Sequence, residues 1–213
     1  MDPVRMIQES RALIILRGDY GDRLEEIVRI LVEEGFKAIE VAMNAPCAAE
    51  QIVRLRAAFA DRAAVGAGTI LSLEDARRAL EMGARFLVSP HVDETLLAFC
   101  REASIPMIPG ALTPTEIWRA WRSGAALVKI FPAMPGGPEL VRNLRGPFPD
   151  VPFLPTGGIT TENAAAFLQA GATAVGIGGA LVGSRVMEPD GLLWLRETSR
   201  LLYRRLHDAS TLS

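Results

Sequence analysis

Lysine is nearly absent from this chain, and one of its two lysines lies where a charged side chain is least expected. Lys and Arg together number 23, but only Lys37 and Lys129 are lysines. Lys129 interrupts the apolar run 125–132, which is typical of a buried strand. Burial of an unpaired ammonium is strongly unfavourable, whereas a lysine can lose its proton and act as a nucleophile. The position of Lys129 therefore predicts a Schiff-base lysine.

Each lysine also has a simpler interpretation without a catalytic role. Lys129 could extend from the end of its strand to solvent, as long cationic side chains often do. Lys37 lies at the start of its predicted strand, away from the expected active face, and we expect it to be solvated.

Four segments of the chain begin with a glycine that is followed by a short apolar run. Each follows a helical stretch, so we expect the glycine to end a helix in the left-handed conformation and the run to form a buried parallel strand. The glycines are 48, 41 and 47 residues apart, and each interval is long enough for two strand–helix units. The segments are 35–41, 83–89, 124–130 and 171–177.

Weaker strand candidates lie between these segments, and helix-start signals separate them. Ser72 and Thr113 are placed as N-caps, and Thr113 is followed by Pro114 and by Glu116 at capping-box spacing. Eight strands alternating with helices predict a single (β/α)8 TIM-barrel domain over residues 1–213, with a short N-terminal helix, a C-terminal closing helix and a loose end. An open doubly wound sheet is the alternative, but no G-x-G-x-x-G follows the first strand. The weaker candidates are 12–17, 64–69, 106–109 and 152–156.

The repeat places two opposite charges inside the predicted barrel. Glu40 and Lys129 both lie five residues after their glycines, as do Val88 and Gly176, so the four would form one layer. Strands two and six face each other across a barrel. We therefore expect the carboxylate and the amine to point toward one another in a dry pocket, where Gly176 leaves space for a ligand. The alternative is a buried ion pair that only fixes the strand register.

Polar and turn residues gather at the expected carboxyl ends of the strands, where barrel enzymes carry their active sites. Arg17 could hold a substrate carboxylate, for which a guanidinium is suited, or it could simply be exposed. Thr69 could bind the same carboxylate or begin a helix. Glycine pairs after strands seven and eight match a backbone phosphate site, although glycine also serves tight turns. The residues at strand ends are Arg17, Glu40, Thr69, Ser89, Pro109, Lys129 and Thr156, and the pairs are Gly157-Gly158 and Gly178-Gly179.

Composition limits the classes of protein to which the chain can belong. The formal charge is −2 and charges of both signs alternate, so no basic surface for nucleic acid is expected. No apolar run approaches the roughly 18 residues of a membrane span, and the first residues lack a signal-peptide layout, which favours a cytoplasmic protein. Cys47 and Cys100 are isolated, and His91 and His207 are the only histidines. We expect reduced thiols, no metal and no cofactor.

At these residues the chain resembles the 2-keto-3-deoxy-6-phosphogluconate (KDPG) / 4-hydroxy-2-oxoglutarate (KHG) aldolase family, class I lyases on a (β/α)8 barrel that are usually trimeric. The similarity runs from about residue 12 to residue 182. The family motifs occur in family order at 39–41, 66–69, 88–90, 109–110, 113–116, 128–132 and 155–159.

The resemblance implies a role for each site residue. Lys129 would be the Schiff-base lysine and Glu40 the general acid/base, while Thr69 and an arginine would bind the pyruvate carboxylate. The glycines would hold the phosphate of a 2-keto acid sugar phosphate. The resemblance also implies a homotrimer and a place in the Entner–Doudoroff route. The phosphate glycines are Gly157, Gly158, Gly178 and Gly179, and the expected substrate pocket includes Asn44, Pro90, Phe131 and Thr156.

Two positions depart from the family pattern. Asn44 stands where some members have their carboxylate-binding arginine, whereas Arg17 matches the arginine of other members, including those resembling 6-phosphogalactonate aldolases. Gly179 stands where many members have a serine that helps to bind phosphate. The second departure leaves the preference for phosphate open.

The predicted activity is reversible cleavage of KDPG, or of its galactonate epimer, to pyruvate and glyceraldehyde 3-phosphate. Lys129 would attack the 2-keto carbon, and Glu40 would move protons directly or through a water. One alternative is a 4-hydroxy-2-oxoglutarate aldolase, which gives pyruvate and glyoxylate. More distant alternatives are a phosphosugar isomerase or epimerase with Glu40 as its base, and a non-catalytic sugar-phosphate binding protein.

Overall fold

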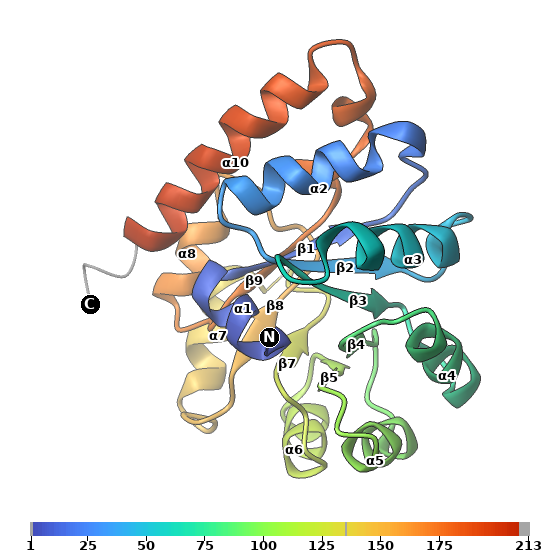
Figure 1. Ribbon diagram of the computed structural model, residues 1–213. Coiled ribbons are helices and arrows are strands. Elements are labelled where there is room, and N and C mark those ends of the chain that lie inside the picture. Colours follow the sequence, from blue (N-terminus) through green and yellow to red (C-terminus); the bar gives the residue numbers. More distant parts are fainter. Residues whose placement is uncertain (1, 135, 209–213) are drawn as a thin grey trace.

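Parallel strands surrounded by helices make up the protein in the computed structural model, which describes residues 2–134 and 136–208 (Figure 1). Six strands form one sheet in the order β5-β4-β3-β2-β1-β9, and three form a second sheet in the order β6-β7-β8. The strand pairs are parallel. Strand and helix alternate along the chain, as the repeat predicts, except that β6 follows β5 directly.

The elements have the following bounds. The strands are β1 Ala12–Leu16, β2 Ala38–Ala42, β3 Ala64–Gly68, β4 Leu87–Val88, β5 Met107–Ile108, β6 Gly110–Ala111, β7 Val128–Ile130, β8 Phe153–Pro155 and β9 Val175–Ile177. The α-helices are α1 Pro3–Ser10, α2 Leu24–Glu33, α3 Ala48–Phe59, α4 Leu73–Glu81, α5 Glu94–Glu102, α6 Pro114–Arg122, α7 Gly137–Arg145, α8 Ala164–Gln169, α9 Gly179–Val182 and α10 Gly191–Asp208. Two short 3-10 helices, η1 and η2, cover Gly21–Arg23 and Ser184–Met187.

Pro109, the last residue of the fifth predicted strand (106–109), separates β5 from a further short strand, β6, which lies beyond the predicted bounds. Proline has no N–H for a strand ladder, and the division leaves two sheets instead of the expected single eight-stranded one. Hydrogen bonds still join the two sheets. The Lys129 N–H donates to the Pro109 carbonyl at 2.9 Å, and Thr156 forms an isolated parallel bridge with Gly176.

The repeated glycines do end helices as predicted. Gly35, Gly83, Gly124 and Gly171 have φ angles of 104°, 93°, 91° and 101°, which is the left-handed region that glycine adopts most easily. The predicted helix starts are also present. Ser72 accepts a hydrogen bond from the Asp75 N–H, and Thr113 and Glu116 form a complete capping box. Local signals thus set both ends of these units.

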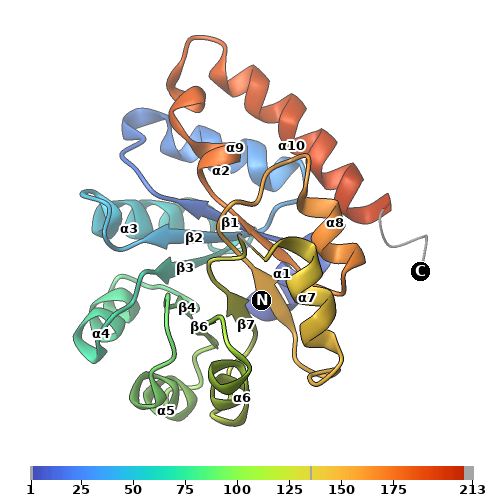
Figure 2. The same ribbon diagram turned by 180° about the vertical axis from the view of Figure 1, so that it is seen from behind.

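Side chains of the strands divide between two clusters. Residues such as Ile39 and Val41 face the helices, while Ala38, Val88 and Leu127 meet inside the ring of strands. Helix α1 covers the amino ends of the strands: it lies across them in Figure 1 and behind them in Figure 2. Its fully buried Ile7 belongs to the inner cluster, so α1 closes this end with apolar side chains.

The predicted closing helix is α10, which runs beside α2 and α8 (Figures 1 and 2). Glu34, the residue after α2, accepts hydrogen bonds from Arg196 and Arg200 of α10. The loose end predicted after this helix lies at 209–213, outside the described residues. Within 2–134 and 136–208, no helix combines the length and the apolar character needed to cross a membrane.

Candidate active site

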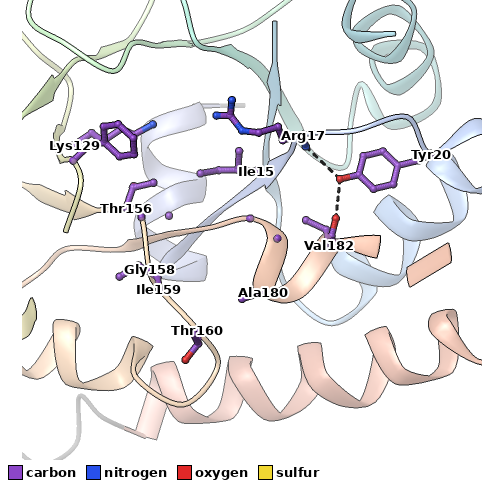
Figure 3. A pocket seen from close by; sticks show the side chains of 16 residues that line it. Ile15, Arg17, Tyr20, Lys129, Thr156, Gly158, Ile159, Thr160, Ala180 and Val182 are labelled. Atoms are coloured by element: carbon purple, nitrogen blue, oxygen red, sulfur yellow. Dashed lines mark hydrogen bonds between the residues drawn. The ribbon is translucent and has the colours of Figure 1, made fainter. Parts of the chain in front are cut away.

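A cavity of about 400 Å³ opens at the carboxyl ends of β1, β7, β8 and β9 (Figure 3). Four of the predicted polar or aromatic residues line it, namely Arg17, Lys129, Phe131 and Thr156. The four predicted phosphate-site glycines, Gly157, Gly158, Gly178 and Gly179, line it as well. The cavity wall therefore combines residues 15–20, near the start of the chain, with residues from its second half, 129–131, 156–160 and 176–183.

Lys129 lies in the middle of β7 with 4% of its surface exposed. It shares the inward parity of Leu127, and its amine is 5.0 Å from the centre of the Phe131 ring. Figure 3 shows the Lys129 and Arg17 side chains pointing toward one another across the cavity. The interpretation of Lys129 as a lysine that reaches solvent from the end of a strand is wrong, because the side chain is buried and ends in the cavity.

Glu40 lies at the centre of β2, not at its carboxyl end as expected, and its side chain is fully buried. It has the inward parity of Ala38, but it is not among the residues that line the cavity. Among the described residues, neither carboxylate oxygen has a hydrogen-bond partner. The alternative of a buried ion pair with Lys129 that only fixes the strand register is therefore wrong, because the two side chains are not joined.

Gly68 provides the space that the Glu40 carboxylate occupies. A Cβ atom added to Gly68 would lie 1.8 Å from Oε1 of Glu40, a separation that no relaxed structure tolerates. Gly176, which was expected to leave space for a ligand, lines the cavity, and a Cβ there would lie 2.2 Å from Oγ1 of Thr156. A Cβ at either position would therefore force the Glu40 or Thr156 side chain to move.

Arg17, Asn44 and Thr69 form one polar group at the mouth of the cavity. Arg17 donates to Oδ1 of Asn44 at 2.8 Å and to Oγ1 of Thr69 at 3.4 Å. Thr69 has a φ of 58°, an unusual conformation for a β-branched residue that tends to occur at functional sites. Arg17 is exposed but held by these partners, while Asn44 and Thr69 support it from outside the cavity lining.

The opposite end of the cavity is built from main chain. Gly157 and Gly158 have φ angles of 91° and 78°. Gly178 and Gly179 begin α9, where the first amides of a helix have no partner within it. Arg17 and Lys129 are the only cations among the described lining residues, and both lie away from Gly158 and Ala180 in Figure 3. This end of the cavity is lined by glycines and, among the described residues, carries no positive side chain.

Several lining residues were missed by sequence analysis. Tyr20 is the clearest, because it is one of only two tyrosines and lies three residues after Arg17, a signal that could have been used. Thr160 also lines the cavity, but its hydroxyl accepts hydrogen bonds from the Glu162 and Asn163 N–H groups. The other missed residues are Ile15, Ile159, Ala180, Val182 and Gly183.

Besides Glu40, Asn44 and Thr69, the predicted residues Ser89, Pro90 and Pro109 also lie outside the cavity lining. Pro90 packs against Gly110, where an added Cβ would be 2.3 Å from the Pro90 carbonyl oxygen. Ser89 is buried and donates to the His91 carbonyl at 2.5 Å. In the part of the chain that the structure describes, no three His, Cys, Asp or Glu side chains are placed to hold a metal ion, and Cys47 and Cys100 are free thiols.

Comparison with known proteins identifies close relatives of this arrangement. The family model for KDPG and KHG aldolase matches residues 4–193. The chain is 32% identical to 2-dehydro-3-deoxy-6-phosphogalactonate aldolase of Escherichia coli K12, over 78% of this chain and 82% of the relative. It is 39% identical to 2-dehydro-3-deoxy-phosphogluconate aldolase of Treponema pallidum, over 69% and 71%.

A solved structure adds a chemical observation. KDPG aldolase from Legionella pneumophila, with pyruvate captured as a covalent carbinolamine intermediate, matches with a TM-score of 0.85 and 26% identity, over 95% of this chain and 98% of that one.

Proposed function

This chain belongs to the KDPG and KHG aldolase family, and we propose that it reversibly cleaves KDPG, or its galactonate epimer, to pyruvate and D-glyceraldehyde 3-phosphate. As a member of that family it is an aldolase, a carbon–carbon lyase. The observation that carries the substrate proposal is the buried amine of Lys129 at the wall of a cavity that has a guanidinium at one end and main-chain amides at the other.

Lys129 is the proposed nucleophile. Its neutral amine attacks the 2-keto carbon, and loss of water from the carbinolamine gives an iminium. The electrons of the C3–C4 bond flow into this iminium as the aldehyde leaves, and the resulting enamine is protonated and hydrolysed to pyruvate. The covalent pyruvate adduct in the Legionella relative supports the same chemistry here. No cofactor enters any step.

Glu40 is the proposed general acid/base. Its unpartnered carboxylate can accept the C4 hydroxyl proton, directly or through a water, and return a proton to the enamine. Arg17, supported by Asn44 and Thr69, binds the substrate carboxylate through charge-assisted hydrogen bonds. Phe131 and Thr156 line the space between the two ends of the substrate.

The glycine end is the proposed phosphate site, formed by the amides of Gly157, Gly158, Gly178 and Gly179. One observation favours a second substrate, 4-hydroxy-2-oxoglutarate, which carries no phosphate. No cationic side chain lies among the described residues at this end of the cavity, and Gly179 provides no hydroxyl. Cleavage rates for the two substrates distinguish the alternatives, and equal catalytic efficiency would overturn the phosphate site.

Trapping with borohydride tests the mechanism. Incubation with pyruvate and borohydride, followed by intact-mass spectrometry and peptide mapping, is expected to place a reduced pyruvyl group on Lys129. The adduct should be absent from Lys129→Ala and present in Lys37→Ala, which removes the only other lysine of the chain, an exposed one. A folded protein that turns over sugar phosphates without forming this adduct would instead be a Glu40-dependent isomerase, and Lys129→Arg would then keep its activity.

Architecture and assembly are part of the same proposal. The hydrogen bond from Lys129 to Pro109 and the bridge from Thr156 to Gly176 support a single domain whose two sheets act as one eight-stranded barrel. The proposed homotrimer and Entner–Doudoroff role rest on family resemblance, whereas the proposed cytoplasmic location rests on the composition of the chain. Sedimentation of the purified protein tests the trimer.

A further inference from the structure

Tyr20 connects the two ends of the cavity wall. Its hydroxyl accepts a hydrogen bond from the Arg17 N–H at 3.2 Å and donates one to the Val182 carbonyl at 2.8 Å (Figure 3). Arg17 follows β1, whereas Val182 ends α9, so the contact joins segments 162 residues apart. The phenol oxygen of Tyr20 therefore links the main chain at Arg17 to helix α9, which carries two of the glycines at the other end of the cavity.

The Tyr20 hydroxyl is held in one protonation state and one place. Only 4% of the residue is exposed, and burial raises the pKa of the phenol, so the group remains a donor to Val182. The Arg17 loop is also fixed from its other side, because Nε2 of Gln51 donates to the Gly18 carbonyl at 2.7 Å. Gln51 is 2% exposed, and this contact does not involve α9.

Helix α9 joins Val182 to the phosphate-site glycines within a single turn. It has only four residues, and the Val182 N–H donates to the Gly178 carbonyl. Gly183 is packed against the start of the same turn, since a Cβ there would lie 2.4 Å from the Gly179 carbonyl oxygen. A displacement of Val182 therefore moves Gly178 and Gly179 with it.

We propose that Tyr20 is a positioning residue that sets the distance between Arg17 and the α9 glycines, and thereby selects keto acids whose carboxylate and distal phosphate span that distance. The inference rests on the proposed function, because it assigns Arg17 and α9 to opposite ends of one substrate. Tyr20 acts through these groups and not on the reacting atoms. Its loss should reduce discrimination between substrates while leaving the Schiff-base step intact.

The test is the ratio of kcat/KM for KDPG to kcat/KM for 4-hydroxy-2-oxoglutarate. Tyr20→Phe keeps the ring and removes the oxygen, and it should lower this ratio about five-fold, because both hydrogen bonds that link Arg17 to Val182 are lost. Tyr203→Phe is the matched control, because it alters the only other tyrosine, on α10, and should leave the ratio unchanged. Gln51→Met should lower kcat/KM equally for both substrates, because Gln51 contacts the Arg17 loop but not α9.

The outcomes separate this inference from the proposed function. An unchanged ratio in folded Tyr20→Phe, or a wild-type ratio near one, overturns the inference while pyruvate trapping on Lys129 still upholds the aldolase. Absence of trapping in the wild type removes both.

A second measurement does not depend on the folding of Tyr20→Phe. In Tyr203→Phe protein grown with 3-fluorotyrosine, Tyr20 carries the only fluorine. Its 19F NMR resonance should shift on addition of pyruvate and again on addition of inorganic phosphate. A resonance that does not shift with phosphate contradicts the link to α9.

Discussion

The two ends of the cavity differ in what they are made of. At the Arg17 end, side chains from three loops meet, and Asn44 and Thr69 hold the guanidinium. At the glycine end, four glycines line the cavity and the described side chains are uncharged. A side-chain site recognises its ligand by charge and is lost when atoms are removed. A main-chain site recognises an anion through N–H groups and is lost when an added side chain obstructs it.

Of the changes that test this difference between the two ends, removal of the Arg17 guanidinium should have the largest effect on KM. Arg17→Met deletes the proposed carboxylate partner, and the KM for pyruvate in the aldol direction should rise about 30- to 100-fold, as expected for charge-assisted hydrogen bonds. Steady-state kinetics measure the change. Arg62→Met is the control, because Arg62 is an exposed side chain against Phe59. A pyruvate KM equal to that of the wild type would place the carboxylate elsewhere.

Adding one carbon to the glycine end should have an intermediate effect. Gly158 has a φ of 78°, and a Cβ there would lie 2.3 Å from Cγ of Met134. Gly158→Ala should raise the KM for KDPG about ten-fold and lower stability by about 1–2 kcal/mol through backbone strain. Thermal unfolding and kinetics measure the two effects. Gly146→Ala, at a position with a φ of −54°, is the control, and equal behaviour of the two variants would exclude a role for this turn.

The smallest effect should come from converting the main-chain end into a side-chain end. A Cβ on Gly179 would meet no atom within 4 Å, so Gly179→Ser should fold normally. Its hydroxyl should lower the KM for KDPG about two- to five-fold, as one added hydrogen bond predicts, without changing the KM for 4-hydroxy-2-oxoglutarate. Gly179→Ala adds the carbon without the oxygen. An equal gain in Gly179→Ala would mean that the phosphate does not reach this position.

Sequence predicted the parts of the fold that local signals specify. The four helix-ending glycines and the capping box at Thr113 depend on a few adjacent residues, and all of them are present. The inward parity of Glu40 and Lys129 followed from the two-residue alternation of a strand. The short strand β6 after Pro109 was missed because strand pairing depends on the partner strand, here β7, as well as on the run itself.

The walls of the cavity were harder to predict because they depend on loop geometry. No local pattern indicates that the Tyr20 hydroxyl reaches Val182, since the two residues are brought together only by the pairing of β1 with β9. The group of Arg17, Asn44 and Thr69 likewise depends on the order of β1, β2 and β3 in the sheet. Residue types suggested their chemistry, but tertiary structure was needed to join them.

Helix α1 closes the amino ends of the strands with apolar side chains, which leaves one route for substrate and product. With Ile7 filling that end, substrate arrives and product departs through the same carboxyl-end mouth. The proposed chemistry then sets the order of product release. The aldehyde is free as soon as the C3–C4 bond breaks, whereas the three-carbon fragment stays tethered to Lys129 until hydrolysis. Glyceraldehyde phosphate should therefore leave before pyruvate, and in the synthetic direction pyruvate should bind first.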